Sequence, residues 1–153
     1  ERLTNSGKRF TSMRETTVLV GYYNKRQYEW IERSCMYNIR VGSKNGLVQF
    51  KPEIFGARYL LLYGSNELKT EKIWEIISDS PKLVSRDELK ELQYPTEPSA
   101  ENYILFNLKP VVEGTFGNTA WDISKLPGYN EVSPPRKPFA ESMVSLMKVA
   151  VPN

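Results

Sequence analysis

Basic and aromatic residues are interleaved densely between residues 22 and 44 of this 153-residue chain. Aromatic rings can stack on nucleobases, and Lys and Arg side chains neutralise phosphates. Arg and Asn can also contact purine edges through paired hydrogen bonds. This mixture favours a solvent-facing surface that binds a nucleic acid. The candidate residues are Lys25, Arg26, Trp30, Arg33, Tyr37, Asn38, Arg40 and Lys44.

Two roles divide these candidates. We expect the five cations to contact phosphates, and Tyr37, Asn38 and one tryptophan, Trp30 or Trp121, to contact bases. The alternative is structural, because aromatic residues of a small β-rich domain usually belong to its core. The core is the favoured place for Trp30, whereas both interpretations stay open for the stretch from Tyr37 to Lys44.

The chain lacks the residues that most catalytic chemistries require. The chain has no histidine and a single cysteine, Cys35, which excludes Ser-His and Cys-His catalysis, His-containing metal sites and an internal disulfide. No glycine-rich nucleotide-binding motif is present. A metal-dependent nuclease would have to use carboxylates near a lysine, and the candidates are Glu67 and Glu71 with Lys72, or Asp87 and Glu88 with Lys90. We therefore expect a binding module that is not an enzyme and has no cofactor.

The charges are distributed unevenly. Residues 1–64 carry 11 Lys and Arg against 5 acids, a net charge of +6, whereas residues 65–101 carry 5 against 9, a net charge of −4. Residues 102–153 add +1, which gives +3 overall. A basic first part suits a partner that carries phosphates, although the fold can bring the acidic middle beside it and cancel its field.

A strand and a helix must position the first candidates. The apolar, β-branched run Thr16–Tyr23 predicts a strand. Asn24 is a good helix N-cap, and Tyr23 and Tyr28 occupy the positions of a hydrophobic staple. These signals predict a helix over Lys25–Ser34.

The next candidates fall in a predicted hairpin. Residues 37–41 alternate like a strand, and Asn45–Gly46 is a strong turn signal, so residues 37–50 are expected to pair with each other. Further strands are expected over 57–63, 72–77 and 102–108, and Val111–Trp121 can hold another. Ser85 and Glu88 form a capping box that predicts a helix over Arg86–Leu92. A closing helix over 140–148 would turn Met143, Leu146 and Met147 inward.

This order of elements predicts an α+β fold built on a curved, mostly antiparallel sheet or small β-barrel with two or three short helices. Residues 1–15 are polar, basic and without periodicity, and are interpreted as a flexible arm. Residues 16–153 are expected to form one domain. No apolar run is long enough for a membrane helix, so we expect a cytoplasmic protein without a membrane partner.

Three segments carry a resemblance to a known class of modules. They are Glu29-Trp30-Ile31 in the predicted helix, Tyr37-Asn38-Ile39-Arg40 before a glycine turn, and the strand ARYLLLYG at 57–64. Their order resembles the PUA-, EVE- and YTH-like domains that read DNA for bacterial restriction systems, some of which hold modified bases in an aromatic pocket. The resemblance covers residues 16–108 and implies DNA recognition for an attached or partner effector such as a nuclease. A protein-interaction or structural subunit that binds no nucleic acid is the alternative.

Overall fold

The computed structural model describes residues 16–43, 46–47, 52–77, 81–131 and 138–152. Residues 1–15, for which a flexible arm is expected, lie outside this range. The strands are β1 (Thr17–Tyr22), β2 (Met36–Arg40), β3 (Gly42–Ser43), β4 (Gly46–Leu47), β5 (Tyr59–Tyr63), β6 (Lys69–Thr70), β7 (Ile73–Ile76), β8 (Lys82–Ser85), β9 (Asn102–Pro110), β10 (Thr119–Asp122), β11 (Phe139–Ser142) and β12 (Ala150–Pro152). The helices are α2 (Lys25–Ser34), α3 (Arg86–Glu91), α4 (Pro127–Glu131) and α5 (Met143–Lys148), with 3₁₀ turns at Pro52–Gly56 and Ile123–Lys125.

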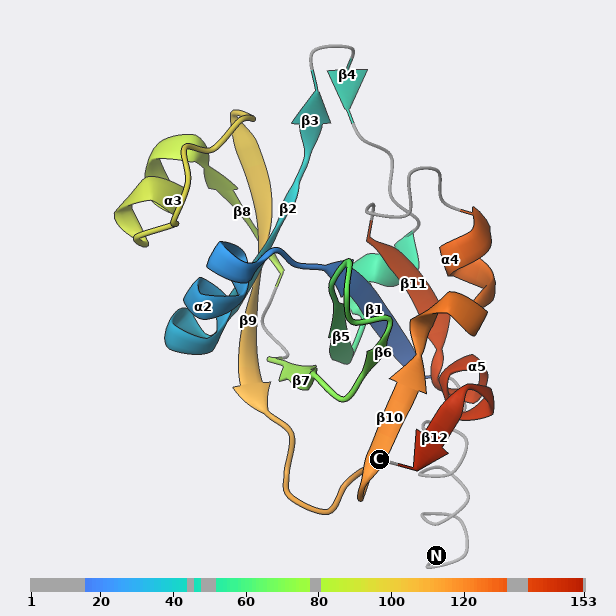
Figure 1. Ribbon diagram of the computed structural model, residues 1–153. Helices are drawn as coiled ribbons and strands as arrows, with labels where there is room; N and C mark the ends of the chain where they lie inside the picture. The colour runs from blue at the N-terminus through green and yellow to red at the C-terminus, as the bar shows by residue number, and fades with distance from the viewer. Residues whose placement is uncertain (1–15, 44–45, 48–51, 78–80, 132–137, 153) are drawn as a thin grey trace, which may run out of the picture.

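A curled seven-stranded sheet dominates the fold (Figure 1). Its strand order is β11-β1-β5-β7-β9-β2, and β8 pairs with β9 beside this path. All of these pairs are antiparallel except β1 with β5. The sheet rolls into a half-barrel, and a second small sheet has the order β12-β10-β6. The expected α+β class with a curved, mostly antiparallel sheet is therefore confirmed.

Strands β1 and β5 are buried on both faces. Leu19, Leu60 and Leu62 pack into the core beneath α2, while Val20 and Leu61 pack on the opposite side with the C-terminal elements. Side chains of a strand alternate between its two faces, so a strand covered on both sides must be apolar throughout. This is why β5 is a continuous apolar run, as the sequence predicted.

Helix α2 forms where its capping signals predicted it. The Asn24 side chain accepts a hydrogen bond from the Gln27 backbone N–H at 2.9 Å. The Tyr23 and Tyr28 rings lie 4.9 Å apart, as expected of a hydrophobic staple. The helix ends at Cys35, whose backbone is left-handed with φ 55° and whose N–H bonds the Ile31 carbonyl. The predicted helix α3 and its Ser85–Glu88 capping box are also confirmed.

The predicted hairpin over residues 37–50 is wrong in the partner of its first strand, although a short local pair forms at its predicted turn. Strand β2 pairs with β9 instead, with Tyr37 opposite Phe106 and Ile39 opposite Ile104. Among the residues that the structure describes between 37 and 50, local pairing is confined to β3 and β4; residues 44–45 and 48–50 lie outside the described range. The reason is burial: three consecutive β2 residues are buried, and a two-stranded ribbon cannot cover both of their faces.

The C-terminal helix is shorter than predicted. Strand β11 occupies residues 139–142 and pairs with β1, and the Ser142 side chain then caps α5 by accepting from the Ser145 backbone N–H. Met143 and Leu146 are buried as expected, but Met147 is 53% exposed, so its predicted inward position is wrong. Met143 and Leu146, three residues apart, form the buried side of α5, and Met147 follows on the exposed side.

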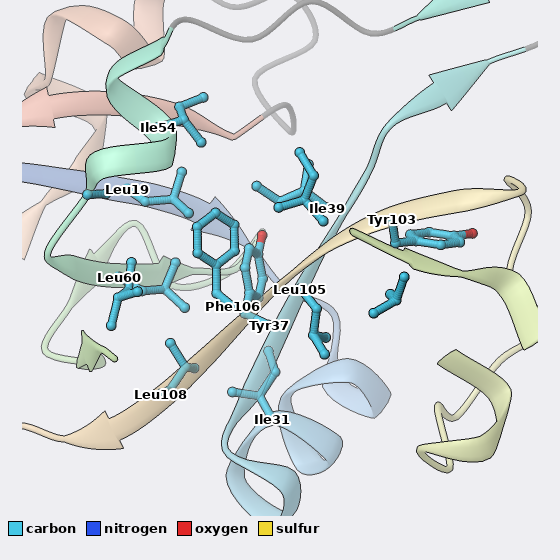
Figure 2. Close-up of a cluster of buried hydrophobic side chains, with 14 of the residues drawn as sticks. Leu19, Ile31, Tyr37, Ile39, Ile54, Leu60, Tyr103, Leu105, Phe106 and Leu108 are labelled. Carbon is cyan, nitrogen blue, oxygen red and sulfur yellow. The ribbon is translucent and has the colours of Figure 1, made fainter. Parts of the chain in front are cut away.

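The curled sheet brings β2 against β1, although the two strands are far apart in the strand order. The Tyr37 side chain reaches across the core among Leu19, Leu60 and Phe106 (Figure 2). Its hydroxyl donates a hydrogen bond to the Tyr22 carbonyl at 3.2 Å. A Cβ at Gly21 would lie 2.7 Å from the Tyr37 ring carbon Cζ, which is closer than real Cβ contacts. Glycine at this position is what lets the Tyr37 phenol lie against the β1 backbone.

The Gly21 contact gives the first prediction. Gly21→Ala should lower the free energy of unfolding by about 1–3 kcal/mol, because the added methyl group overpacks a rigid contact. Urea denaturation measures the loss. Gly56→Ala is the matched control, since a Cβ there meets nothing within 4 Å. Equal stability of the two variants would contradict the role assigned to Gly21.

Candidate functional site

The aromatic candidates face inward. Trp30 is 1% exposed and Tyr37 is 2% exposed. The Trp30 indole N–H donates to the Leu92 carbonyl at 3.0 Å, so its polar edge is also occupied. Trp121 is fully buried as well. The expectation that rings and cations share one solvent-facing surface is therefore wrong for these rings, and the favoured core position of Trp30 is confirmed.

The four cationic candidates that the structure describes are exposed, and three of them share one surface. Lys25, Arg26 and Arg33 all lie on the solvent side of α2, and Arg26 and Arg33 are two helical turns apart on the same line. Glu29 and Glu32 lie on this side too, so the net charge of the exposed face is modest. We call the three cations the α2 basic face.

The remaining two cationic candidates are separate from this face. Arg40 is exposed at the end of β2, on the same side of that strand as Asn38, two residues before it. Lys44 lies outside the described residues. The structure thus brings together three of the five predicted cations on one element and places a fourth on the neighbouring strand.

Asn38 is the most unusual of the candidates. It is a polar residue in the middle of β2, and it is only 7% exposed. Its side chain forms a hydrogen bond with the Tyr94 hydroxyl. Its carbonyl oxygen Oδ1 has no hydrogen-bond partner. Buried polar atoms are almost always paired, and an unpaired one costs about 1–3 kcal/mol, so this oxygen requires an explanation.

Tyr94 links Asn38 to Trp30. The Tyr94 and Trp30 rings are 5.0 Å apart and meet edge to face at 82°. Tyr94 is half-buried, and burial raises the pKa of its hydroxyl, whereas the hydrogen bond with Asn38 lowers it. We call Trp30, Asn38 and Tyr94 the Asn38 cluster. Sequence reasoning missed Tyr94, although an aromatic residue alone among turn-forming Gln, Pro, Thr and Ser residues was a usable signal.

A second polar cluster fastens the start of α2 to the β5–β6 turn. The Glu67 carboxylate accepts hydrogen bonds from Lys72 Nζ at 2.7 and 2.8 Å, from the Tyr23 hydroxyl at 3.0 Å and from the Thr70 hydroxyl at 3.2 Å. Lys72 Nζ also lies 5.3 Å from the centre of the Tyr28 ring. We call these five residues the Glu67 cluster.

The pKa values of the Glu67 cluster move in opposite directions. Burial alone would raise the pKa of Glu67, but hydrogen bonds from Lys72, Tyr23 and Thr70 outweigh it and lower that pKa. Burial, followed by the hydrogen bond to Glu67, raises the pKa of Tyr23 to about 12. At neutral pH the carboxylate is therefore ionised and the phenol holds its proton. This arrangement is that of a structural ion pair, because each carboxylate oxygen is already occupied.

The metal-nuclease alternative has no support in this geometry. Within the described residues, no group of three or more His, Cys, Asp and Glu side chains is placed to hold a metal ion. Glu67, its main candidate ligand, bonds Lys72 rather than lying free beside Glu71.

Comparison with protein families, with curated proteins and with solved structures finds no match to this chain. Among the helices that the structure describes, none combines the length and the apolar character needed to cross a bilayer. The case for a function therefore depends on the geometry of the α2 basic face and the Asn38 cluster.

The unpaired oxygen of Asn38 gives the second prediction. Asn38→Leu should change the free energy of unfolding by less than about 1 kcal/mol, because removing a buried acceptor without a donor offsets the loss of the hydrogen bond to Tyr94. Asn38→Asp should lower it, because a buried charge replaces the amide. Thermal and urea unfolding report both effects. A loss above about 2 kcal/mol for Asn38→Leu, which is more than the hydrogen bond to Tyr94 supplies, would contradict an unpaired Oδ1.

The raised pKa of Tyr23 gives the third prediction. Below pH 10 the phenol is protonated in both the folded and the unfolded chain. Between about pH 10 and 12 the unfolded chain loses this proton while the folded chain keeps it, so the free energy of unfolding falls as the pH rises. Tyr23→Phe should remove this part of the alkaline destabilisation.

Urea titrations at several pH values from 9 to 12 measure this difference between wild type and Tyr23→Phe. Glu67→Gln is the control. It should narrow the pH range over which the free energy of unfolding falls, because the Glu67 hydrogen bond and charge contribute to the raised pKa of Tyr23. Parallel stability curves for wild type and Tyr23→Phe would refute the assignment.

Proposed function

We propose that this chain is a nucleic-acid-binding module, with DNA as the first candidate, that delivers an attached or partner effector such as a nuclease to its target. One observation carries the proposal. The helix that packs on β2, directly over the strand carrying the unpaired Asn38 oxygen, presents three exposed cations on its outer side. Phosphate-binding groups next to a hydrogen-bonding group that lacks a partner are what a base-reading surface requires.

The proposed roles of the candidate residues follow their positions. Lys25, Arg26 and Arg33 contact the phosphate backbone, and Arg40 extends this contact along β2. Asn38 contacts a base. Tyr37 holds β2 against β1 from within the core, as its hydrogen bond to the Tyr22 carbonyl indicates. A cytoplasmic location belongs to the same proposal and agrees with the unpaired cysteine.

Salt dependence tests this proposal and is the fourth prediction. The logarithm of the affinity for a short duplex should fall linearly with the logarithm of salt concentration, with a slope near −0.9 for each phosphate neutralised. Arg26→Glu should weaken binding about tenfold or more and reduce that slope by about 1. Fluorescence anisotropy between 50 and 200 mM salt is the measurement.

The matched control is Lys148→Glu. It makes the same change in charge on α5, which lies across the molecule from α2 (Figure 1). This variant should change the affinity by less than about twofold. Equal losses for both variants would mean that net charge alone drives binding, and binding without salt dependence would overturn the proposal.

A protein-docking function is the second candidate, and α5 is the element that favours it. Val144 is 39% exposed and Met147 is 53% exposed, three residues apart on one side of α5. Exposed apolar side chains that neighbour each other are typical of contact surfaces between proteins. If the chain binds no oligonucleotide even at low salt, this side of α5 becomes the leading candidate surface.

A further inference from the structure

The Asn38 cluster leaves one buried hydrogen-bond acceptor, Asn38 Oδ1, without a partner. The Asn38 side chain offers an amide NH₂ group, which carries two N–H donors, and one acceptor oxygen, Oδ1. The amide is engaged by the Tyr94 hydroxyl, and Oδ1 is engaged by nothing among the described residues. We propose, as a deepening of the proposed function, that an unstacked base displaces the Tyr94 side chain and binds where that side chain now lies. The base that binds there presents an N–H donor beside an acceptor.

The contacts of Tyr94 define what can replace it. Its ring meets the Trp30 ring, and its hydroxyl oxygen accepts from the Asn38 amide. An adenine or cytosine edge offers an aromatic ring for Trp30, a ring nitrogen acceptor for the amide, and an exocyclic amino group that donates to Oδ1. The base therefore reproduces both contacts of Tyr94 and adds the hydrogen bond that Oδ1 lacks.

The segment carrying Tyr94 is suited to move. It follows α3 as an irregular stretch with a left-handed backbone at Gln93, whose φ is 66°. Tyr94 is only half-buried, unlike Trp30 and Asn38 beneath it. The ion pair between Lys90 and Glu97 that spans this segment is exposed at both ends, and such pairs hold weakly. Displacing the Tyr94 side chain exposes Asn38 without disturbing β2.

The α2 basic face lies beside this position. Arg26 and Arg33 are four residues before and three residues after Trp30, so both neighbour it on the helix surface. A nucleotide whose base takes the place of Tyr94 thus has cations close by for its phosphates. Because the base must be unstacked, the expected ligands are single-stranded or flipped-out nucleotides.

The fifth prediction compares two nucleosides that differ by one donor group. Adenosine carries the exocyclic amino group, and purine riboside lacks it while keeping the ring nitrogens. In NMR titrations of the full chain, adenosine should shift the Asn38 side-chain amide and the Trp30 indole N–H. Purine riboside should bind about tenfold more weakly, because one hydrogen bond is missing.

Two variants separate this mechanism from a structural role. Asn38→Leu should abolish the preference for adenosine while the chain stays folded. Tyr94→Ala should bind adenosine several-fold more tightly than wild type, since the competing side chain is gone. Tyr94→Phe keeps the ring but loses the acceptor, and should show a smaller gain. A purely structural tyrosine would weaken binding or leave it unchanged when removed.

The outcomes distinguish this inference from the proposed function. Absence of Asn38 shifts with adenosine, equal binding of both nucleosides, or weaker binding by Tyr94→Ala overturns the inference. If salt-dependent duplex binding persists in the same preparation, the proposed function stands alone. If duplex binding is also absent, both fail together.

Discussion

The contact of the Tyr37 phenol with the backbone at Gly21 and Tyr22 determines how the sheet closes. Strand β2 lies at one end of the strand order and β1 near the other, and this side chain bridges them through the core. Strand geometry then fixes the neighbouring residue. Because Tyr37 points into the half-barrel, Asn38 must point to the opposite face of β2, where its side chain meets Tyr94. The same contact that stabilises the curl therefore places a polar side chain where little water can reach it.

The two polar clusters show different ways of handling buried polarity. In the Glu67 cluster every carboxylate oxygen has a partner, and the group works as a brace between α2 and the β5–β6 turn. In the Asn38 cluster one acceptor is left over. Natural proteins satisfy local rules almost everywhere and depart from them mainly at functional sites. That contrast is why the Asn38 cluster, and not the more highly charged Glu67 cluster, supports a functional hypothesis.

Capping residues and apolar runs in the sequence correctly predicted the elements that interactions between nearby residues determine. The N-caps Asn24 and Ser85 gave α2 and α3 almost to the residue, and the apolar run gave β5. The pairing of β2 with β9 could not be predicted, because it joins residues almost 70 positions apart and competed with a strong local turn signal. The inward direction of Tyr37 depends on that pairing, so its burial was beyond sequence reasoning. The core position of Trp30 and the exposed cations of α2 followed from patterns within the sequence.

The fold also places charges of opposite sign side by side. Helix α3 carries exposed Asp87, Glu88 and Glu91, and the segment that follows it contacts Trp30 on α2. The acidic middle of the chain thus neighbours the α2 basic face. This is the arrangement, left open by the charge distribution, in which the two regions partly cancel each other's field. The acidic side chains of α3 weaken, on the side of α2 that faces them, the positive potential that a polyanion meets.

The pairing of β1 with β11 has a consequence for biosynthesis. Leu19 is opposite Ala140, so the first strand of the described chain receives this neighbour only after more than one hundred further residues have been made. Until then a hydrophobic strand emerging from the ribosome has an open edge, and contacts so distant in sequence form slowly. The β1 edge consequently stays unpaired until β11 has been synthesised, which exposes it to wrong pairing during translation.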